Sequence, residues 1–537
     1  MAFEFERDAN PVVMNKPSKS SGFSGINHFV FWPPFILLLG AVGLNFFVPD
    51  QFAKITNGTN AWLLSNFGWM FLLCGFACVL LCVYICMSRF GEIRLGGKNA
   101  KPLMPMWNWF AITVCTTIAV GILLWSTAEP LKHLASPPAA KNIEANSPEA
   151  AKFALSTMYL HWTFTPYAIY AVASLTFAFT YYNMRRPYSL GSPLAPLFGD
   201  ITKGPLGKFI DAVCLYSLVA GMAASLGGGI LILSGGLHYL IPQIPAKSPF
   251  VWAIIAGIII TTFVISSATG LMKGIRILSS INTYALFALA IFVLIFGPTV
   301  FILTFGLECF GIYLTRFFEM NLFGDSFAEV EGNTNWAQGW IIFYWAVWFA
   351  WTPITACFLG QISYGRTVRE FMLVNFIFPA LFGVAWMAIF SGSAINFELF
   401  GGGELGKLVA GKDVAYEMVA FKVFSYLPLT IVLVVFYVCS TFICFVTSAD
   451  SNTTAMAAIS STGITPENSE GGLAIKIAWG VTVGLVAWVM ISFADIEGIK
   501  IISTLGGFPA CILMILVVIS LCRILMNYKE LNVIDHE

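Results

Sequence analysis

The stretch QGWIIFYWAVWFAWTPITACFLGQISYGRTVRE, residues Gln338–Glu370, decides the fold. It stays apolar for about 25 residues, which is long enough to cross a lipid bilayer as a helix, and then ends in a charged turn. Four aromatic side chains share one face of that helix: Trp340, Tyr344, Trp348 and Trp351. Pro353 follows and removes a backbone donor, so we expect the helix to kink or open just past the aromatic face.

An aromatic face of this kind has two interpretations. It can be packing or an interfacial belt, but a belt lies at the helix ends, whereas Trp345 and Trp348 lie near the middle. It can also be a box whose ring faces hold a quaternary ammonium or sulfonium group. Each such contact is worth about 0.5–2 kcal/mol.

The composition places the whole chain in a membrane. Of its 537 residues 58% are hydrophobic and 10% charged, and the mean hydropathy is +0.81, which is typical of a polytopic membrane protein. A net charge of zero indicates no nucleic-acid partner. The polar first residues lack the apolar core of a signal peptide. The twelve cysteines show no metal-site spacing, so we expect no cofactor.

Twelve apolar segments are long enough to span a bilayer, and the sequence therefore predicts an all-α protein with twelve transmembrane helices. The segments are 30–48, 67–88, 107–127, 153–182, 206–236, 250–268, 278–307, 337–361, 370–395, 424–449, 473–493 and 502–526. Most of the 28 basic residues fall on the side of the N-terminus. This bias predicts a multi-pass protein of the cell inner (plasma) membrane with both termini in the cytoplasm.

After the first two spans, the remaining ten divide into two groups of five that are nearly equal in length. Because each group has an odd number of helices, the second repeat crosses the membrane in the opposite direction to the first. The expected organisation is a cytoplasmic tail 1–28, two peripheral helices 29–106, a first repeat 107–307, an outer amphipathic segment 308–336, a second repeat 337–526 and a cytoplasmic tail 527–537. Each repeat is expected to open with a broken helix. The small and hydroxyl residues of Thr116–Gly121 suit such a break in the third span.

The segment Trp340–Trp351, with Ile362-Ser363 and the turn Gly365–Glu370, resembles the signature helix and turn of the betaine/carnitine/choline transporters. The resemblance implies a LeuT-like core in which helices 3–7 and 8–12 are the inverted repeats. It also implies transport of a small zwitterionic substrate by alternating access, with membrane lipid around a homotrimer. Such a protein is not an enzyme.

The resemblance also implies a substrate site. Its aromatic residues are Trp162, Tyr167, Tyr170, Trp348 and Trp351, and its backbone donors come from Ile118, Ala119 and Gly121. Tyr167 and Val347 stand where better-known members carry tryptophan, which affects the choice of substrate. Choline-moving members carry an aspartate at the position of Gly121, so its absence favours a zwitterion such as glycine betaine, carnitine or a sulfonium propionate. Trp340 and Trp345 are expected to line the pathway or to pack.

The expected coupling ion is a single sodium ion. By resemblance, the hydroxyls of Thr447 and Ser448 and carbonyls near Cys115 and Ile118 hold it, although hydroxyls in membrane helices commonly bond to their own helix instead. Sodium-independent exchangers carry an arginine at the position of Asn282, which cannot replace an ion.

Two further polar residues lie near this expected site. Glu129 matches a family glutamate in the transport pathway at the outer end of the third span, where a carboxylate is usually just solvated. His161 is expected to be a hydrogen-bonded packing residue.

Four alternatives remain open at this stage. Two are a sodium-independent substrate/product antiporter and a proton-coupled choline-type transporter of the same family. A passive channel would show flux without accumulation. A membrane enzyme acting on methylated amines would need a metal cluster or a nucleophile–base pair, which five scattered histidines do not offer.

Overall fold

The structure is a computed structural model that describes residues 25–117, 121–269, 272–328, 330, 333–410, 414–462 and 471–535. Within these ranges the regular structure is helical, and the only β-type pairing is two isolated bridges, Ile26 with Ser461 and Arg94 with Thr367. The prediction of an all-α protein is confirmed for this part of the chain.

The helices follow one another with short connections. The N-terminal ten are α1 His28–Phe47, α2 Pro49–Met87, α3 Met106–Thr117, α4 Ile122–Ala135, α5 Pro148–Trp162, α6 Phe164–Ala178, α7 Ala195–Phe198, α8 Pro205–Leu240, α9 Pro249–Thr269 and α10 Met272–Phe296. The others are α11 Thr299–Thr315, α12 Phe317–Leu322, α13 Phe343–Gln361, α14 Val368–Met372, α15 Phe378–Phe400, α16 Tyr416–Phe424, α17 Thr430–Ile459 and α18 Leu473–Leu531.

Seven of the described helices are long and apolar enough to cross a bilayer, or eight if the bent pair α10–α11 is one span. This confirms a polytopic membrane protein. The number twelve stays a prediction, because two predicted spans are each built from two shorter helices, α3–α4 and α5–α6. Two others run together in α18, which continues across a kink of non-helical backbone at Ala494 and Asp495.

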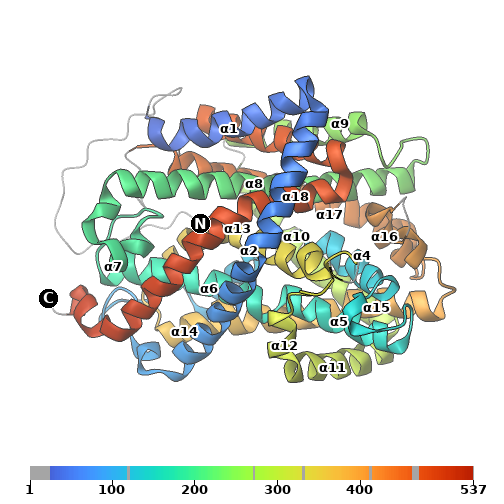
Figure 1. The fold of residues 1–537 in the computed structure, drawn as a ribbon, viewed down its shortest axis with the longest axis horizontal. Helices are drawn as coiled ribbons and strands as arrows, with labels where there is room; N and C mark the ends of the chain where they lie inside the picture. Colours follow the sequence, from blue (N-terminus) through green and yellow to red (C-terminus); the bar gives the residue numbers. More distant parts are fainter. Residues whose placement is uncertain are drawn as a thin grey trace.

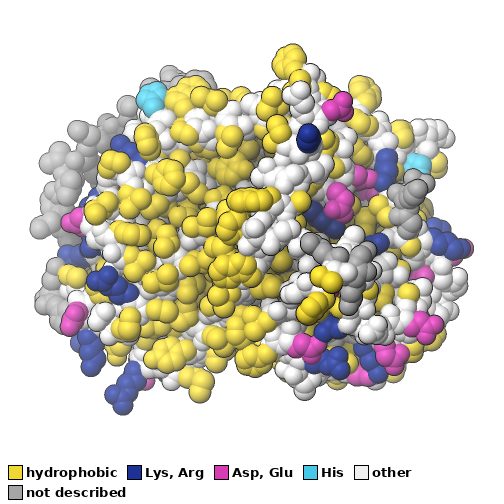
Figure 2. All heavy atoms as spheres, viewed as in Figure 1, with side chains coloured by type: hydrophobic (Ala, Val, Ile, Leu, Met, Phe, Trp, Pro, Cys, Tyr) yellow, Lys and Arg dark blue, Asp and Glu magenta, His cyan; other side chains and the backbone are white. Residues whose placement is uncertain are grey.

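The helices pack around a buried centre formed by α6 and α13. In Figure 1, α1 and α8 run nearly parallel across the view and α2 crosses them obliquely. The most extensive helix pairs are α8 with α18 and α6 with α13. Figure 2 shows hydrophobic side chains over the middle of this face and charged side chains mainly toward the two ends of the long axis. An apolar band of this kind is the surface that lipid tails cover.

The predicted opening of the α13 helix at Pro353 is not present. The helix continues through this proline to Gln361. Proline leaves the carbonyl of Phe349 without its usual backbone donor, and the hydroxyl of Thr352 donates to that carbonyl instead. The backbone irregularity lies earlier, in a π-helical turn at Gln338–Ile342. A side-chain hydrogen bond therefore repairs the helix that the proline was expected to open.

The fourth predicted span does break next to its proline. It divides into α5 and α6 at Thr163, whose backbone angles (φ −124°, ψ −113°) are not helical. The ring of Pro166 excludes a helical carbonyl at Trp162, four residues earlier. The bend that the sequence predicted is thus a complete interruption between two helices.

The seventh predicted span, 278–307, is not a single helix. It turns through 104° between the Tyr284–Phe296 part of α10 and α11. Pro298 cannot donate a backbone hydrogen bond, and Gly297 ends α10 by donating to the carbonyl of Val293. Residues 299–307 consequently belong to the helix that continues into the predicted outer segment.

Replacing Gly383 by alanine is expected to destabilise the break in the fourth span. A Cβ at Gly383 would lie 2.5 Å from the carbonyl oxygen of Trp162, which is backbone and cannot rotate away. Overpacking of this kind costs about 1–3 kcal/mol, so the thermal midpoint of the detergent-solubilised protein should fall. Gly392→Ala, on the same helix α15, is the matched control because its nearest atoms lie at 3.9 Å. Equal midpoints for the two variants would contradict the argument.

Candidate functional site

Four of the predicted site aromatics form one cluster around Trp348. Its ring centroid lies 5.5 Å from Trp162 and 5.3 Å from Tyr170, both edge to face, and 6.2 Å from Tyr167. All four side chains are buried. Edge-to-face packing points the ring faces in different directions, so a cation beside the cluster can contact more than one π face. Rings this close leave no space for a trimethylammonium group between them. A ligand must therefore bind on their outer faces or after the rings move apart.

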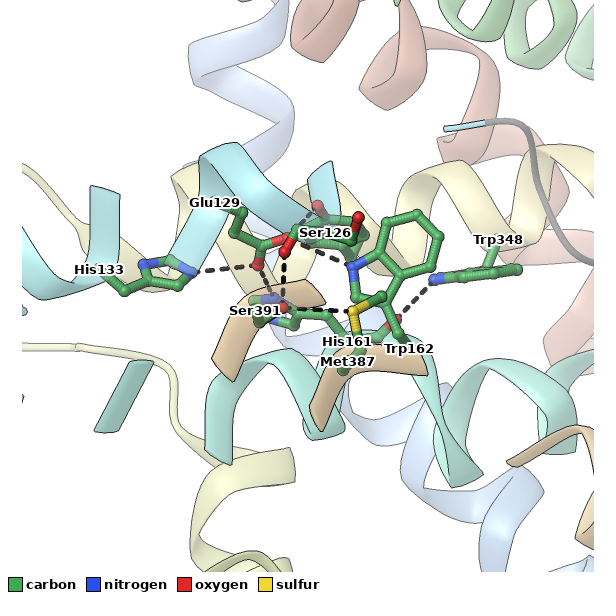
Figure 3. Close-up of polar contacts among 9 residues, drawn as sticks. Ser126, Glu129, His133, His161, Trp162, Trp348, Met387 and Ser391 are labelled. Carbon is green, nitrogen blue, oxygen red and sulfur yellow. Dashed lines mark hydrogen bonds and ion pairs between the residues drawn. The ribbon is translucent and has the colours of Figure 1, made fainter. Parts of the chain in front are cut away.

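The break between α5 and α6 orients the central ring. The indole Nε1 of Trp348 donates to the backbone carbonyl of His161 over 3.1 Å. In an unbroken helix that carbonyl would accept from the backbone N–H four residues later. The interruption at Thr163 frees it for Trp348. The same break also turns Trp162 toward Trp348, as Figure 3 shows.

The predicted backbone donors meet the cluster at the start of α4. Gly121 is the N-cap of that helix, and a Cβ there would lie 3.7 Å from Cη2 of Trp162. Ile118 and Ala119 lie outside the described residues. The first N–H groups of a helix have no partner within it, so the N-terminus of α4 brings donors and a positive dipole end beside the Trp162 ring.

The other predicted tryptophans lie apart from the cluster. The indole of Trp351 contacts α8, where a Cβ at Gly221 would lie 3.4 Å from it. Trp345 is fully buried against α2, with its Nε1 3.6 Å from the Cβ position of Gly75. Trp340 lies under the ammonium of Lys500, which is 4.4 Å from its ring centroid. Trp345 thus packs, and Trp351 is not a member of the ring cluster.

Glu129 is not solvated, in contrast to the expectation for a carboxylate at a helix end. Its side chain is fully buried, and four donors from α4, α5 and α13 converge on it. On one oxygen, Oε1 lies 2.6 Å from Nδ1 of His161 and 3.1 Å from Nε2 of His133. On the other, Oε2 accepts from Nε1 of Trp162 over 3.3 Å and from the hydroxyl of Tyr344. Figure 3 shows the carboxylate between the two imidazoles and the Trp162 ring.

Sequence reasoning missed His133 and treated the histidines as scattered. The fold corrects this, because His133 and His161 both reach Glu129. The spacing Glu129-x-x-x-His133 places both side chains on one helix face and was a readable signal. The contact of His161 with Glu129 could not be predicted, because it depends on how α4 packs against α5. His161 was expected to be hydrogen-bonded, and it is.

The predicted ion ligands are described only in part. Thr447 donates to the carbonyls of Ile443 and Cys444 over 2.9 and 3.0 Å, the local bonding that hydroxyls in membrane helices favour. The Ser448 hydroxyl accepts from Nδ2 of Asn452 over 3.0 Å. Both oxygens retain lone pairs that an ion can use. Of the rest, Ile118 and the side chains of Cys115 and Asn282 lie outside the described residues.

A small apolar cavity begins just beyond the aromatic helix face. Its volume is about 40 Å³. Its lining residues are Ala173, Leu190, Pro193, Leu194, Ile210, Cys214, Thr352, Pro353, Ala356, Ala510, Leu513, Met514 and Val517. It lies between α6, α8, α13 and α18, and it is too small for a betaine-sized molecule.

Comparison with known proteins identifies relatives over nearly the whole chain. The model of the BCCT family, described as betaine/carnitine/choline family transporter, matches residues 29–530. The chain is 31% identical to the glycine betaine transporter OpuD of Bacillus subtilis over 93% of its own length and 95% of that protein. It is 30% identical to the ectoine/hydroxyectoine transporter of Virgibacillus pantothenticus, over 96% and 99% of the two chains.

A further relative is the high-affinity choline transport protein of Escherichia coli, 31% identical over 95% of this chain and 73% of that one. The family and these relatives are transporters and not enzymes. The resemblance seen in the sequence is therefore confirmed over residues 29–530, and the chain belongs to the betaine/carnitine/choline transporter family.

Proposed function

We propose that this protein is a secondary active symporter that imports a zwitterionic quaternary-ammonium or sulfonium compound, driven by one sodium ion. The observation that carries the proposal is the cluster of Trp162, Tyr167 and Tyr170 around Trp348 beside the N-terminus of α4. The ring faces attract the cationic end of the substrate. The helix N-terminus attracts its carboxylate. The two attractions point to a molecule that carries both charges.

The proposed architecture is that of the family resemblance. Twelve spans form a LeuT-like core of two inverted repeats in the cell inner membrane, with both termini in the cytoplasm and three copies of the chain in the assembly. The break between α5 and α6 supports a binding site at the bilayer midplane, where such transporters interrupt their helices. The buried Glu129 contacts then form part of the outer closure, and the cavity past Pro353 is the beginning of the inner pathway.

Sodium is the proposed coupling ion, at Thr447 and Ser448 with carbonyls near Cys115 and Ile118. The lone pairs left on both hydroxyls and the substitution of Asn282 for an exchanger's arginine support this choice. Sodium and substrate would each favour the occluded state, so each should raise the affinity of the other by the same factor.

Choline is a second candidate substrate. A cation without a carboxylate needs a counter-charge in a dry site, and the Glu129 carboxylate lies beside Trp162. The Escherichia coli relative is named for choline transport. Against this, both oxygens of Glu129 are already engaged by donors, and Gly121 supplies no charge.

The proposal is tested by uptake into proteoliposomes with and without an inward sodium gradient. The labelled substrates are glycine betaine, carnitine, choline, dimethylsulfoniopropionate and ectoine. We expect concentrative uptake of one zwitterion only with the sodium gradient. Uptake of choline would instead favour the second candidate, in which the Glu129 carboxylate balances the positive charge of the substrate.

Three outcomes would contradict the proposal. Counterflow that is indifferent to sodium would make the protein an exchanger. Uptake driven by a proton gradient alone would make the proton, and not sodium, the coupling ion. Flux that only equilibrates the compartments would make the protein a channel.

A further inference from the structure

Glu129, His133 and His161 bring three metal-ligating atoms within 4.8 Å of one another in a fully buried position (Figure 3). We propose that this cluster binds one divalent transition-metal ion of the Zn²⁺ type. Its ligands are Oε1 of Glu129, Nε2 of His133 and Nδ1 of His161. The site is separate from the proposed sodium site, and it does not depend on what the protein transports.

The geometry already converges on one point. Both imidazoles direct a nitrogen at the same carboxylate oxygen, over 2.6 and 3.1 Å. In the present arrangement each of the two contacts is an N–H hydrogen bond to the carboxylate. A bound metal ion would replace both of these hydrogens. Zinc bonds of about 2.0–2.2 Å place tetrahedral ligands about 3.4 Å apart. Each of the two oxygen–nitrogen contacts therefore has to lengthen by less than about 1 Å to accept an ion.

The donor set selects the class of metal. Two imidazoles and a carboxylate suit Zn²⁺, Co²⁺ or Ni²⁺, whereas Mg²⁺ and Ca²⁺ prefer oxygen ligands alone. Three protein ligands leave a fourth position for water, as in many zinc sites. The second oxygen of Glu129 keeps its contacts with Trp162 and Tyr344, which hold the carboxylate in place.

The surrounding charges are compatible with a cation. Each histidine lies in the last turn of its helix, His133 in α4 and His161 in α5, where the helix dipole is negative. The ammonium of Lys500 lies over the ring of Trp340 and is paired with Glu497 across 2.9 Å. An ion bound here would join α4 to α5 directly beside Trp162.

The far nitrogens of the two rings set the expected strength of binding. Among the described residues, Nδ1 of His133 and Nε2 of His161 are buried without a hydrogen-bond partner. A metal-bound imidazole carries its hydrogen on the far nitrogen, where an acceptor normally stabilises it. Because that acceptor is missing on both rings, we expect micromolar affinity and not the nanomolar affinity of structural zinc sites.

The test is metal titration of the purified full-length protein in detergent, after removal of metals with a chelator. Co²⁺ is followed by its visible absorption, and Zn²⁺ by isothermal titration and by displacement of Co²⁺. We expect one ion per chain and the intense absorption of tetrahedral Co²⁺. His133→Asn and His161→Asn should each weaken binding by at least about 100-fold, since even an outer contact is worth 10–100-fold.

The matched control is His238→Asn. This histidine lies in α8 and bonds through Nδ1 to the carbonyl of Ile244 over 2.8 Å, away from the cluster. The variant should bind Zn²⁺ as the wild type does. Zn²⁺ should also raise the thermal midpoint of the wild type and of His238→Asn but not that of His133→Asn.

Three results would overturn the proposal. They are the absence of saturable binding at one ion per chain, the weak absorption of six-coordinate Co²⁺ in the wild type, and equal affinity in a folded His133→Asn variant. The wild-type spectrum decides the matter even if both histidine variants fail to fold. No transport is measured, so an error in the proposed function would leave these readouts unchanged.

Discussion

Trp348→Ala is expected to lose most of its affinity for the transported substrate. The ring is central to the cluster and contacts Trp162, Tyr167 and Tyr170 at 5.3–6.2 Å. Its removal deletes a cation–π surface and also frees the three neighbouring rings to move. Together these losses amount to about 2–4 kcal/mol, or a factor of about 30 to about 1,000 in affinity. Binding of the labelled substrate to the purified protein measures the loss.

Trp386→Ala is the matched control for this variant. Trp386 is a buried tryptophan of α15 that stacks on Phe390 at 4.5 Å and takes no part in the cluster. Both variants lose packing, so their thermal midpoints should fall by similar amounts, whereas only Trp348→Ala should lose the substrate. Trp348→Phe should keep part of the affinity because a ring face remains. Wild-type affinity in a folded Trp348→Ala protein would remove the aromatic-box model.

The double variant Thr447→Ala, Ser448→Ala is expected to lose most of its response to sodium. Each hydroxyl oxygen offers an ion a lone pair although both already take part in local hydrogen bonds. Contacts of this strength with a charged group are worth about 1.5–3 kcal/mol each. The half-saturating sodium concentration for uptake should therefore rise at least about 100-fold.

Thr454→Ala serves as the control for the sodium variant. Its hydroxyl bonds to the carbonyl of Asp450 over 2.8 Å, in the same manner as that of Thr447, and lies about two turns along the same face of α17. Its sodium dependence should match the wild type. An unchanged sodium response in the double variant would move the ion site to other residues.

The membrane character could be predicted from the sequence because it depends on local patterns, and part of the aromatic cluster follows from them as well. Runs of apolar residues predict helices wherever they fold, and helix periodicity places Tyr167 and Tyr170 on one face of α6. The position of Trp162 depends on the break at Thr163, which periodicity does not give. What periodicity cannot give is the partner of a helix face. Trp351 shares a face with Trp348, yet its indole lies against Gly221 of α8.

The two proline sites show a second limit. Pro166 and Pro353 both occur in aromatic helices, and both leave a carbonyl without its backbone donor. At Pro353 the hydroxyl of Thr352 replaces the donor and the helix continues. At Pro166 the chain breaks at Thr163. The helix with a threonine hydroxyl bonded to the free carbonyl is continuous, and the other helix is broken. Where such a hydroxyl points is decided by the folded chain and not by the local sequence.

The polar cluster was hidden for a different reason. A carboxylate near the predicted end of a span was expected to meet water, but α5 and α13 cover Glu129 completely. Burial of a carboxylate is favourable only when donors satisfy it. One donor, His133, is four residues away on the same helix. The other three come from α5 and α13, so only the tertiary structure brings them to the carboxylate.

The hydrogen bond from Trp348 to the carbonyl of His161 bears on how such a site can diversify. The acceptor is main chain, so no exchange of a side chain at position 161 can remove it. The indole is held by the path of the polypeptide, while the residues around it are free to vary. Tyr167 is one such neighbour, with its ring centroid 6.2 Å from that of Trp348. A descendant protein can therefore acquire a new cargo by substituting the surroundings of a ring whose placement it inherits unchanged.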